Sequence, residues 1–152
     1  DLVAISALSG NVTITSNNIT SSLKSLRNGI IVNNSNVVIT DNNIDVVDTG
    51  LDDSYAILVS NSNDVTVNNN NVTYAGQTNG TTVNNAMCIE NSAVKEVNNN
   101  VFNITIPSVD VSWPEIPAGS GNYTRISYSS GVVFKNDTGL NFDDNTIYLN
   151  SI

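Results

Sequence analysis

Four aspartates lie close together in the sequence and could hold a metal ion. They are Asp45, Asp48, Asp52 and Asp53. Carboxylate oxygens are ligands for metal ions such as Ca²⁺, so the cluster is a candidate metal site. The cluster lacks the DxDxDG loop and the closing glutamate of a helix–loop–helix calcium site, and a solvated acidic loop has the same composition. The sequence leaves both interpretations open and indicates no other cofactor.

Aromatic rings that could contact a ligand gather in one segment. Trp113, Tyr123 and Tyr128 all fall between residues 103 and 130, together with the three prolines of the chain. Aromatic rings have flat apolar faces that stack well on sugars and peptides. These three residues form the candidate ligand platform.

Residues for acid–base or nucleophilic catalysis are not evident. The chain has no histidine, no GxSxG motif and no glycine-rich phosphate loop. Asp143 and Asp144 are adjacent, so their side chains point to opposite sides of a strand or corner and cannot alone form the opposed carboxylate pair of a glycoside hydrolase. We predict no catalytic residue.

Glycan attachment is the remaining chemistry that the sequence suggests. The NxS/T motif occurs eight times, and the candidate sites are Asn11, Asn18, Asn71, Asn79 and Asn122. A chain with 28 asparagines produces such motifs freely, and several of them fall in corners that the fold itself requires. We therefore expect a structural role for most of these residues.

Composition excludes several classes of partner. The chain has 14 acidic and five basic residues, and the basic ones form no cluster that could neutralise phosphates, which excludes nucleic acid. No run of 18 apolar residues occurs, so this segment holds no membrane span. Cys88 is the single cysteine, which excludes an internal disulfide and any multi-cysteine metal site.

A sequence repeat must position these residues. The surroundings of Ile39 recur at Ile14, Val67, Val97 and Phe142, at spacings of 25, 28, 30 and 45 residues. An apolar residue precedes each of these anchors by two positions, except in the fourth copy, which has Lys95. Three residues after each anchor stands an asparagine; the five are Asn17, Asn42, Asn70, Asn100 and Asn145.

Each copy contains three short runs of alternating apolar residues, separated by corners of Asn, Ser, Asp and Gly. This pattern is typical of strands and tight turns, and no stretch keeps a helical period for more than a turn or two. Stacked copies would pair every backbone group with the copies above and below. We therefore predict an all-β parallel β-helix of about five rungs, a rung being one three-stranded turn. A β-sandwich with Asn-rich loops does not explain the fixed spacing.

The recurrent asparagines have a natural place in such a fold. Asparagine tolerates the left-handed backbone conformation of a sharp bend, and its side-chain amide can both donate and accept hydrogen bonds. We expect the five asparagines to adopt that conformation and to stack into a ladder.

The stretches NVTITSNNIT, NVVITDNNID and DVTVNNNNVT resemble the repeats of right-handed parallel β-helix proteins, including pectate-lyase-like and NosD-type proteins. The chain is most similar to the Asn- and Thr-rich adhesin-like surface proteins of methanogenic archaea. The right hand of the coil, an extracellular cell-surface location and adhesion to a cell-surface polysaccharide or another cell are implied by this resemblance. The pectate-lyase resemblance implies instead a Ca²⁺-holding carboxylate cluster with an arginine or lysine base, for which the sequence offers Arg27 and Arg125.

The irregular spacing locates insertions. They fall near residues 46–55, 74–85 and 103–130, after the third strand of each copy, and should emerge from one edge of the column. On the first strand, Ile31, Leu58, Cys88 and Val133 should point outward as an apolar stripe. The stripe is either covered by the insertions or a binding site, and Cys88 either a small hydrophobe or a reactive thiol.

We interpret residues 1–152 as one non-catalytic, adhesin-like domain of a longer surface protein, whose neighbouring segments would complete its ends. The alternative is a carbohydrate-active β-helix enzyme, a lyase or hydrolase, or an inactive carbohydrate-binding relative.

Overall fold

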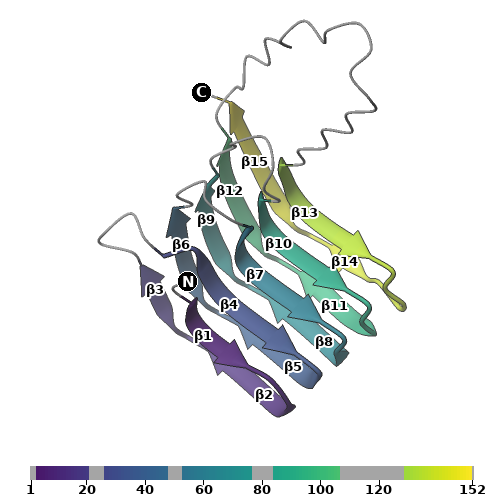
Figure 1. The fold of residues 1–152 in the computed structure, drawn as a ribbon. Helices are drawn as coiled ribbons and strands as arrows, with labels where there is room; N and C mark the ends of the chain where they lie inside the picture. The colour runs from purple at the N-terminus through teal and green to yellow at the C-terminus, as the bar shows by residue number, and fades with distance from the viewer. Residues whose placement is uncertain (1–2, 21–25, 48–52, 77–83, 107–128, 152) are drawn as a thin grey trace, which may run out of the picture.

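The computed structural model describes residues 3–20, 26–47, 53–76, 84–106 and 129–151. The chain winds as a coil in which three short strands make each rung (Figure 1). The described residues contain strands and no helix, hence no helix long and apolar enough to cross a membrane. The predicted all-β, parallel β-helix class is confirmed.

The strands form three parallel sheets of five strands each within the described residues. Sheet A contains β1 (Val3–Ala7), β4 (Asn28–Asn33), β7 (Ser54–Ser60), β10 (Asn84–Glu90) and β13 (Ser129–Lys135). Sheet B contains β2 (Gly10–Thr15), β5 (Ser35–Thr40), β8 (Asn63–Asn68), β11 (Val94–Asn98) and β14 (Phe142–Asp143). Sheet C contains β3 (Asn18–Thr20), β6 (Asn43–Val47), β9 (Asn71–Ala75), β12 (Val101–Ile106) and β15 (Thr146–Ser151).

The anchors of the repeat stack in register along sheet B. Ile14 pairs with Ile39, Ile39 with Val67, and the series continues through Val97 to Phe142. Ile39, Val67 and Val97 are fully buried. Columns of the same kind on sheets A and C complete one continuous core, because alternate side chains of every strand face the inside of the coil.

The irregular fourth copy is explained by a bulge. The register shifts between Val94 and Glu96, so Val94 takes the inward place beside Val65 while Lys95 is exposed. One extra residue in a strand re-aims the side chains on either side of it. Lys95, which breaks the apolar pattern in the sequence, therefore does not enter the core. In the fifth copy Leu140 precedes β14 and is 47% exposed.

Small residues are required near the start of the sheet A strands, where their backbone packs against the core. A Cβ atom on Gly29 would lie 2.5 Å from the Ala56 carbonyl oxygen and 2.9 Å from Ile44 Cγ2. The same column holds Ala56, Ala86 and Gly131, and the strand pairing skips this position in each rung. These small residues thus allow the start of sheet A to lie close to the side chains of sheet C.

The longer connections all lead from sheet C to sheet A, which places their ends at one edge of the coil. The strands extend further than predicted, since they include 46–47, 54–55, 74–75, 84–85, 103–106 and 129–130. The remainder of the predicted insertions, including Trp113, Tyr123 and Tyr128, lies outside the described residues apart from Asp53 and Gly76.

Candidate functional site

The predicted asparagines form an unbroken hydrogen-bonded column at the corner between sheets B and C. Asn42 donates from its backbone N and from Nδ2 to Asn70 Oδ1, both at 3.0 Å. The same pair of bonds links Asn17 to Asn42, Asn70 to Asn100, and Asn100 to Asn145. The central three are almost fully buried. This column, the amide ladder, is confirmed as a structural element.

One part of the prediction is wrong: the ladder residues do not take the left-handed conformation. The residue before each of them does, namely Ser16, Asp41, Asn69, Asn99 and Asp144, with φ between 51° and 57°. The corner therefore divides the two tasks between neighbours. One residue makes the bend, and the next turns its amide inward along the column.

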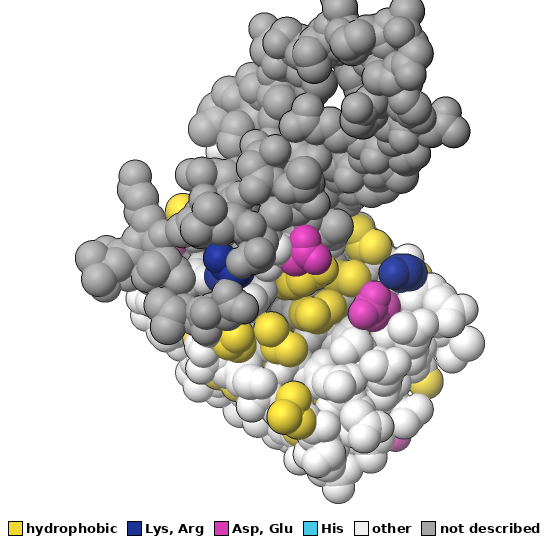
Figure 2. All heavy atoms as spheres, viewed as in Figure 1, with side chains coloured by type: hydrophobic (Ala, Val, Ile, Leu, Met, Phe, Trp, Pro, Cys, Tyr) yellow, Lys and Arg dark blue, Asp and Glu magenta, His cyan; other side chains and the backbone are white. Residues whose placement is uncertain are grey.

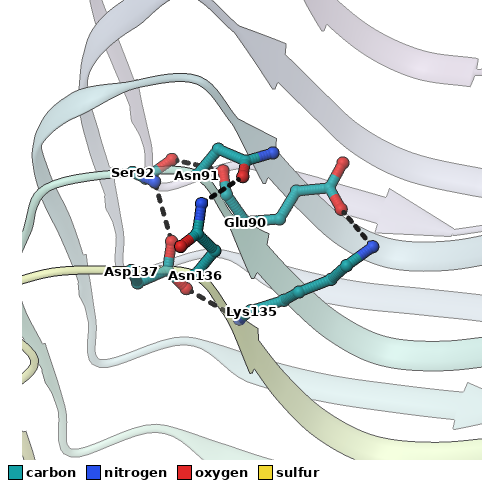
Figure 3. Close-up of polar contacts among 6 residues, drawn as sticks. All are labelled: Glu90, Asn91, Ser92, Lys135, Asn136 and Asp137. Atoms are coloured by element: carbon teal, nitrogen blue, oxygen red, sulfur yellow. Dashed lines mark hydrogen bonds and ion pairs between the residues drawn. The ribbon is translucent and has the colours of Figure 1, made fainter.

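A second column, which the sequence reasoning missed, occupies the corner between sheets A and B. The backbone N of Ser35 donates to Ser62 Oγ at 3.2 Å, and Ser62 N donates to Ser92 Oγ at 3.0 Å. Asp137 ends this serine column by accepting from Ser92 N at 2.8 Å (Figure 3). Burial raises the pKa of Asp137, although the N–H groups of Ser92 and Lys135 act in the opposite direction.

The outer face of sheet A carries the predicted apolar stripe. Ile31, Leu58, Cys88 and Val133 stand in register on neighbouring strands. Their inward neighbours Ile30, Ile57 and Met87 are fully buried. Figure 2 shows apolar side chains gathered on this face with charged side chains bordering them. The structure thus brings the four stripe residues together.

Cys88 and Tyr55 on sheet A are poorly solvated. Cys88 is 5% exposed, and its pKa is raised to about 11 by burial first and by Glu90 and Asp137 next. Burial, followed by the charge of Asp53, raises the pKa of Tyr55 to about 12. A thiol held in its neutral form is a poor nucleophile. Cys88 therefore behaves as a small buried hydrophobe.

An ion pair lies two residues beyond the stripe and was not anticipated. Lys135 Nζ is 3.6 Å from Glu90 Oε2, and the two strands pair at this position (Figure 3). The alternation of strand residues could have revealed it, since Glu90 and Lys135 each follow a stripe residue by two positions. The lysine is largely exposed, so the pair contributes little to stability.

The predicted calcium ligands are only partly described. Asp45 lies in β6 of sheet C, and Asp53 precedes β7 of sheet A. Asp48 and Asp52 lie outside the described residues. In the part of the chain that the structure describes, no three His, Cys, Asp or Glu side chains are grouped closely enough to hold a metal ion.

Three of the glycosylation candidates are exposed and take part in amide contacts on the outside of the coil. Asn11 Oδ1 accepts from Asn36 Nδ2, and Asn18 Oδ1 accepts from Asn43 Nδ2. Asn71 Nδ2 donates to Asn43 Oδ1 at 2.9 Å. The amides of these three residues thus link neighbouring rungs, and glycan attachment to them stays a prediction. Asn79 and Asn122 lie outside the described residues.

A scan against protein-family models, a search of curated proteins and a search of solved structures each found no match for this chain. The parallel β-helix fold therefore rests on the strand pairing and the two columns. The resemblance to particular β-helix families remains part of the proposal below.

Proposed function

We propose that the chain is a non-catalytic extracellular module whose β-helix holds a row of loops for adhesion, as in the adhesin-like surface proteins that its repeats resemble. The ligand class that we propose is a cell-surface polysaccharide. The supporting observation is that the stacked rungs and the segments that join sheet C to sheet A are separate parts of the fold. Buried polar residues are engaged between rungs in the amide ladder and the serine column, whereas segments 48–53, 76–83 and 107–128 all join sheet C to sheet A.

This arrangement suits recognition by loops. Neighbouring rungs are fixed to one another by parallel strand pairing and by side-chain hydrogen bonds, so the ends of successive connections are held at a constant separation. A polysaccharide presents a repeating ligand to which such a row of attachment points can bind in several places at once. The longest of these segments in sequence, 107–128, contains the aromatic residues Trp113, Tyr123 and Tyr128.

A glycan array tests the proposal. Labelled protein is applied to neutral, sulfated and uronic-acid glycans with and without Ca²⁺, and cleavage of uronic-acid polymers is followed in parallel. The matched variant replaces residues 107–128 by a Gly/Ser segment of equal length. We expect retention of the native chain on at least one glycan class, no product, and loss of retention in the variant with an unchanged melting curve.

Three results would overturn the proposal. Product formation would favour the enzyme alternative. Undiminished retention in the variant would place the binding surface on the scaffold. Absence of retention on every glycan would remove the polysaccharide as ligand.

A further inference from the structure

Two NxT motifs lie on the outer face of sheet C, on strands that pair with a further strand on each side. They span residues 71–73 on β9 and 103–105 on β12. Residues two apart in a strand point to the same side. The residues in the middle of the two motifs, Val72 and Ile104, are fully buried in the core. The asparagine and the threonine of each motif therefore both point away from the coil.

The two acceptor amides are open to solvent. Asn71 and Asn103 are exposed, and the threonines of their motifs are exposed or half-buried. Asn103 Oδ1 accepts from Asn150 Nδ2 at 3.2 Å, while Asn103 Nδ2 makes no hydrogen bond within the described residues. Asn71 Nδ2 donates one of its two hydrogens to Asn43 Oδ1. Each side chain can therefore carry a substituent on Nδ2 and keep the hydrogen bond that links it to the neighbouring rung.

The motif at Asn33 has the same form in the sequence but a different environment. Its hydroxyl residue, Ser35, is 4% exposed and belongs to the serine column. Ser35 Oγ donates to the carbonyl of Asn33 at 2.9 Å. An enzyme that recognises the motif must reach both the asparagine and the hydroxyl. The motif at Asn33 is therefore closed in the folded chain, whereas the two motifs of sheet C are open.

An exposed apolar side chain stands next to one of the two acceptors. Val101 pairs with Asn71, points outward from β12 and is 37% exposed. A bulky polar group on Asn71 would lie over this valine and remove part of its surface from water. The exposed valine is thus a second feature, independent of the sequence motif, that fits a glycan at this position.

We propose that Asn71 and Asn103 carry N-linked glycans, which makes the outer face of sheet C a glycosylated face of the coil. Asn103 was not among the candidates suggested by the sequence. The co-substrate is a sugar joined through C1 to a lipid diphosphate. Its C1–O bond breaks and a bond forms from C1 to Nδ2, while the released diphosphate keeps the electron pair and takes up the proton lost from Nδ2. This inference rests on the extracellular location in the proposed function and does not depend on the polysaccharide as ligand.

Peptide mapping by mass spectrometry tests the proposal on the protein from the cells that produce it. We expect a sugar mass on Asn71 and on Asn103, located by fragmentation of chymotryptic peptides, and none on Asn33. Protease treatment of intact cells shows in parallel whether the chain lies outside the cell. A surface-exposed chain without sugar on Asn71 and Asn103 would overturn this inference and leave the proposed function standing. An intracellular chain would overturn both.

Threonine variants separate recognition of the motif from a general effect on the strand. In a chain secreted from a eukaryotic host, Thr105→Ala removes the motif at Asn103 and Thr105→Ser keeps it, and both leave the Asn103 amide in place. We expect Thr105→Ala to lose the mass of one glycan and Thr105→Ser to retain it, with unchanged melting curves after deglycosylation. The same pair of changes at Thr73 should act on Asn71. Equal glycan mass in the alanine and serine variants, or equal occupancy of Asn33 in the folded chain, would overturn the proposal.

Discussion

At the scale of single residues, the side chain of each buried ladder asparagine binds several polar groups at once. Asn70 Oδ1 accepts from the N and Nδ2 of Asn42, and Asn70 Nδ2 donates to the carbonyls of Ile39 and Asn68. Asn70 is 1% exposed, so water cannot replace these bonds. Removing such a side chain leaves buried polar groups without partners, and this is the costly way to lose a hydrogen bond.

Replacement of Asn70 by alanine should therefore lower the free energy of unfolding by about 1 to 3 kcal/mol in urea melts. Asn43→Ala is the matched control, because Asn43 also bridges two rungs but is exposed to solvent. Asn145→Ala should cost less than Asn70→Ala, since Asn145 is only partly buried. Equal losses at Asn70 and Asn43 would contradict a buried ladder.

The poorly solvated thiol and phenol give the second residue-scale prediction, a loss of stability at high pH. Burial raises the pKa of Cys88 from 9.0 to about 11 and that of Tyr55 from 10.0 to about 12. The folded chain keeps these protons at pH values where the unfolded chain releases them. The unfolded state then binds fewer protons, so the free energy of unfolding falls as the pH rises from about 9 to about 12.

Urea midpoints measured at pH 8 and pH 10.5 check this prediction. The combined variant Cys88→Ala, Tyr55→Phe should lose much of the decrease between the two pH values. A decrease of the same size in the variant would assign the effect to other groups.

At the scale of the elements, the close packing between the start of sheet A and sheet C depends on residue size. A Cβ on Gly29 would meet a backbone carbonyl, which has little freedom to move, whereas a Cβ on Gly131 would meet only the terminal methyl of Ile104 at 2.8 Å. Gly29→Ala should lower the free energy of unfolding by about 1 to 3 kcal/mol through overpacking, and Gly131→Ala by less. Chemical denaturation of the two variants is the measurement. A larger loss for Gly131→Ala would contradict the described packing.

The sequence was informative where spacing is constant and uninformative where it shifts. The amide ladder could be predicted because its asparagines always follow the anchor by three residues. The serine column was missed because Ser35 precedes its anchor by four residues but Ser62 and Ser92 by five. The difference arises at the irregular pairing near Val37, where β8 holds one residue more than β5. The spacing is constant when it is measured from the preceding strand of sheet A. Each serine of the column follows an apolar residue of that strand by three positions, and these apolar residues are Val32, Val59 and Ile89.

The spacing of the asparagines could not show which corner residue takes the left-handed backbone and which one joins the amide ladder. Asp41 and Asn42 are both residue types that tolerate a left-handed backbone, so composition does not say which of the two makes the bend. The outward ion pair was missed for a different reason, since only two of the five rungs carry it.

At the scale of the whole molecule, the account depends on strands pairing with the rung above and below and not with their neighbours in sequence. β4 pairs with β1 and β7, and its nearest partners in sequence are therefore about 25 residues away. A β-sandwich of the same strands would instead pair β4 with β5 as a hairpin. The hydrogen-bonded columns and the row of connections both follow from the first arrangement.

Nuclear Overhauser contacts in ¹⁵N-labelled protein test this arrangement most directly. The account predicts contacts from the Asn42 backbone amide to the side-chain amide of Asn70, and from Asn70 to Asn100, with these side-chain amides slow to exchange in D₂O. The exposed amides of Asn43 and Asn71 should exchange fast. Contacts between the antiparallel-paired residues of β4 and β5, with rapid exchange at Asn42, Asn70 and Asn100, would contradict the parallel β-helix.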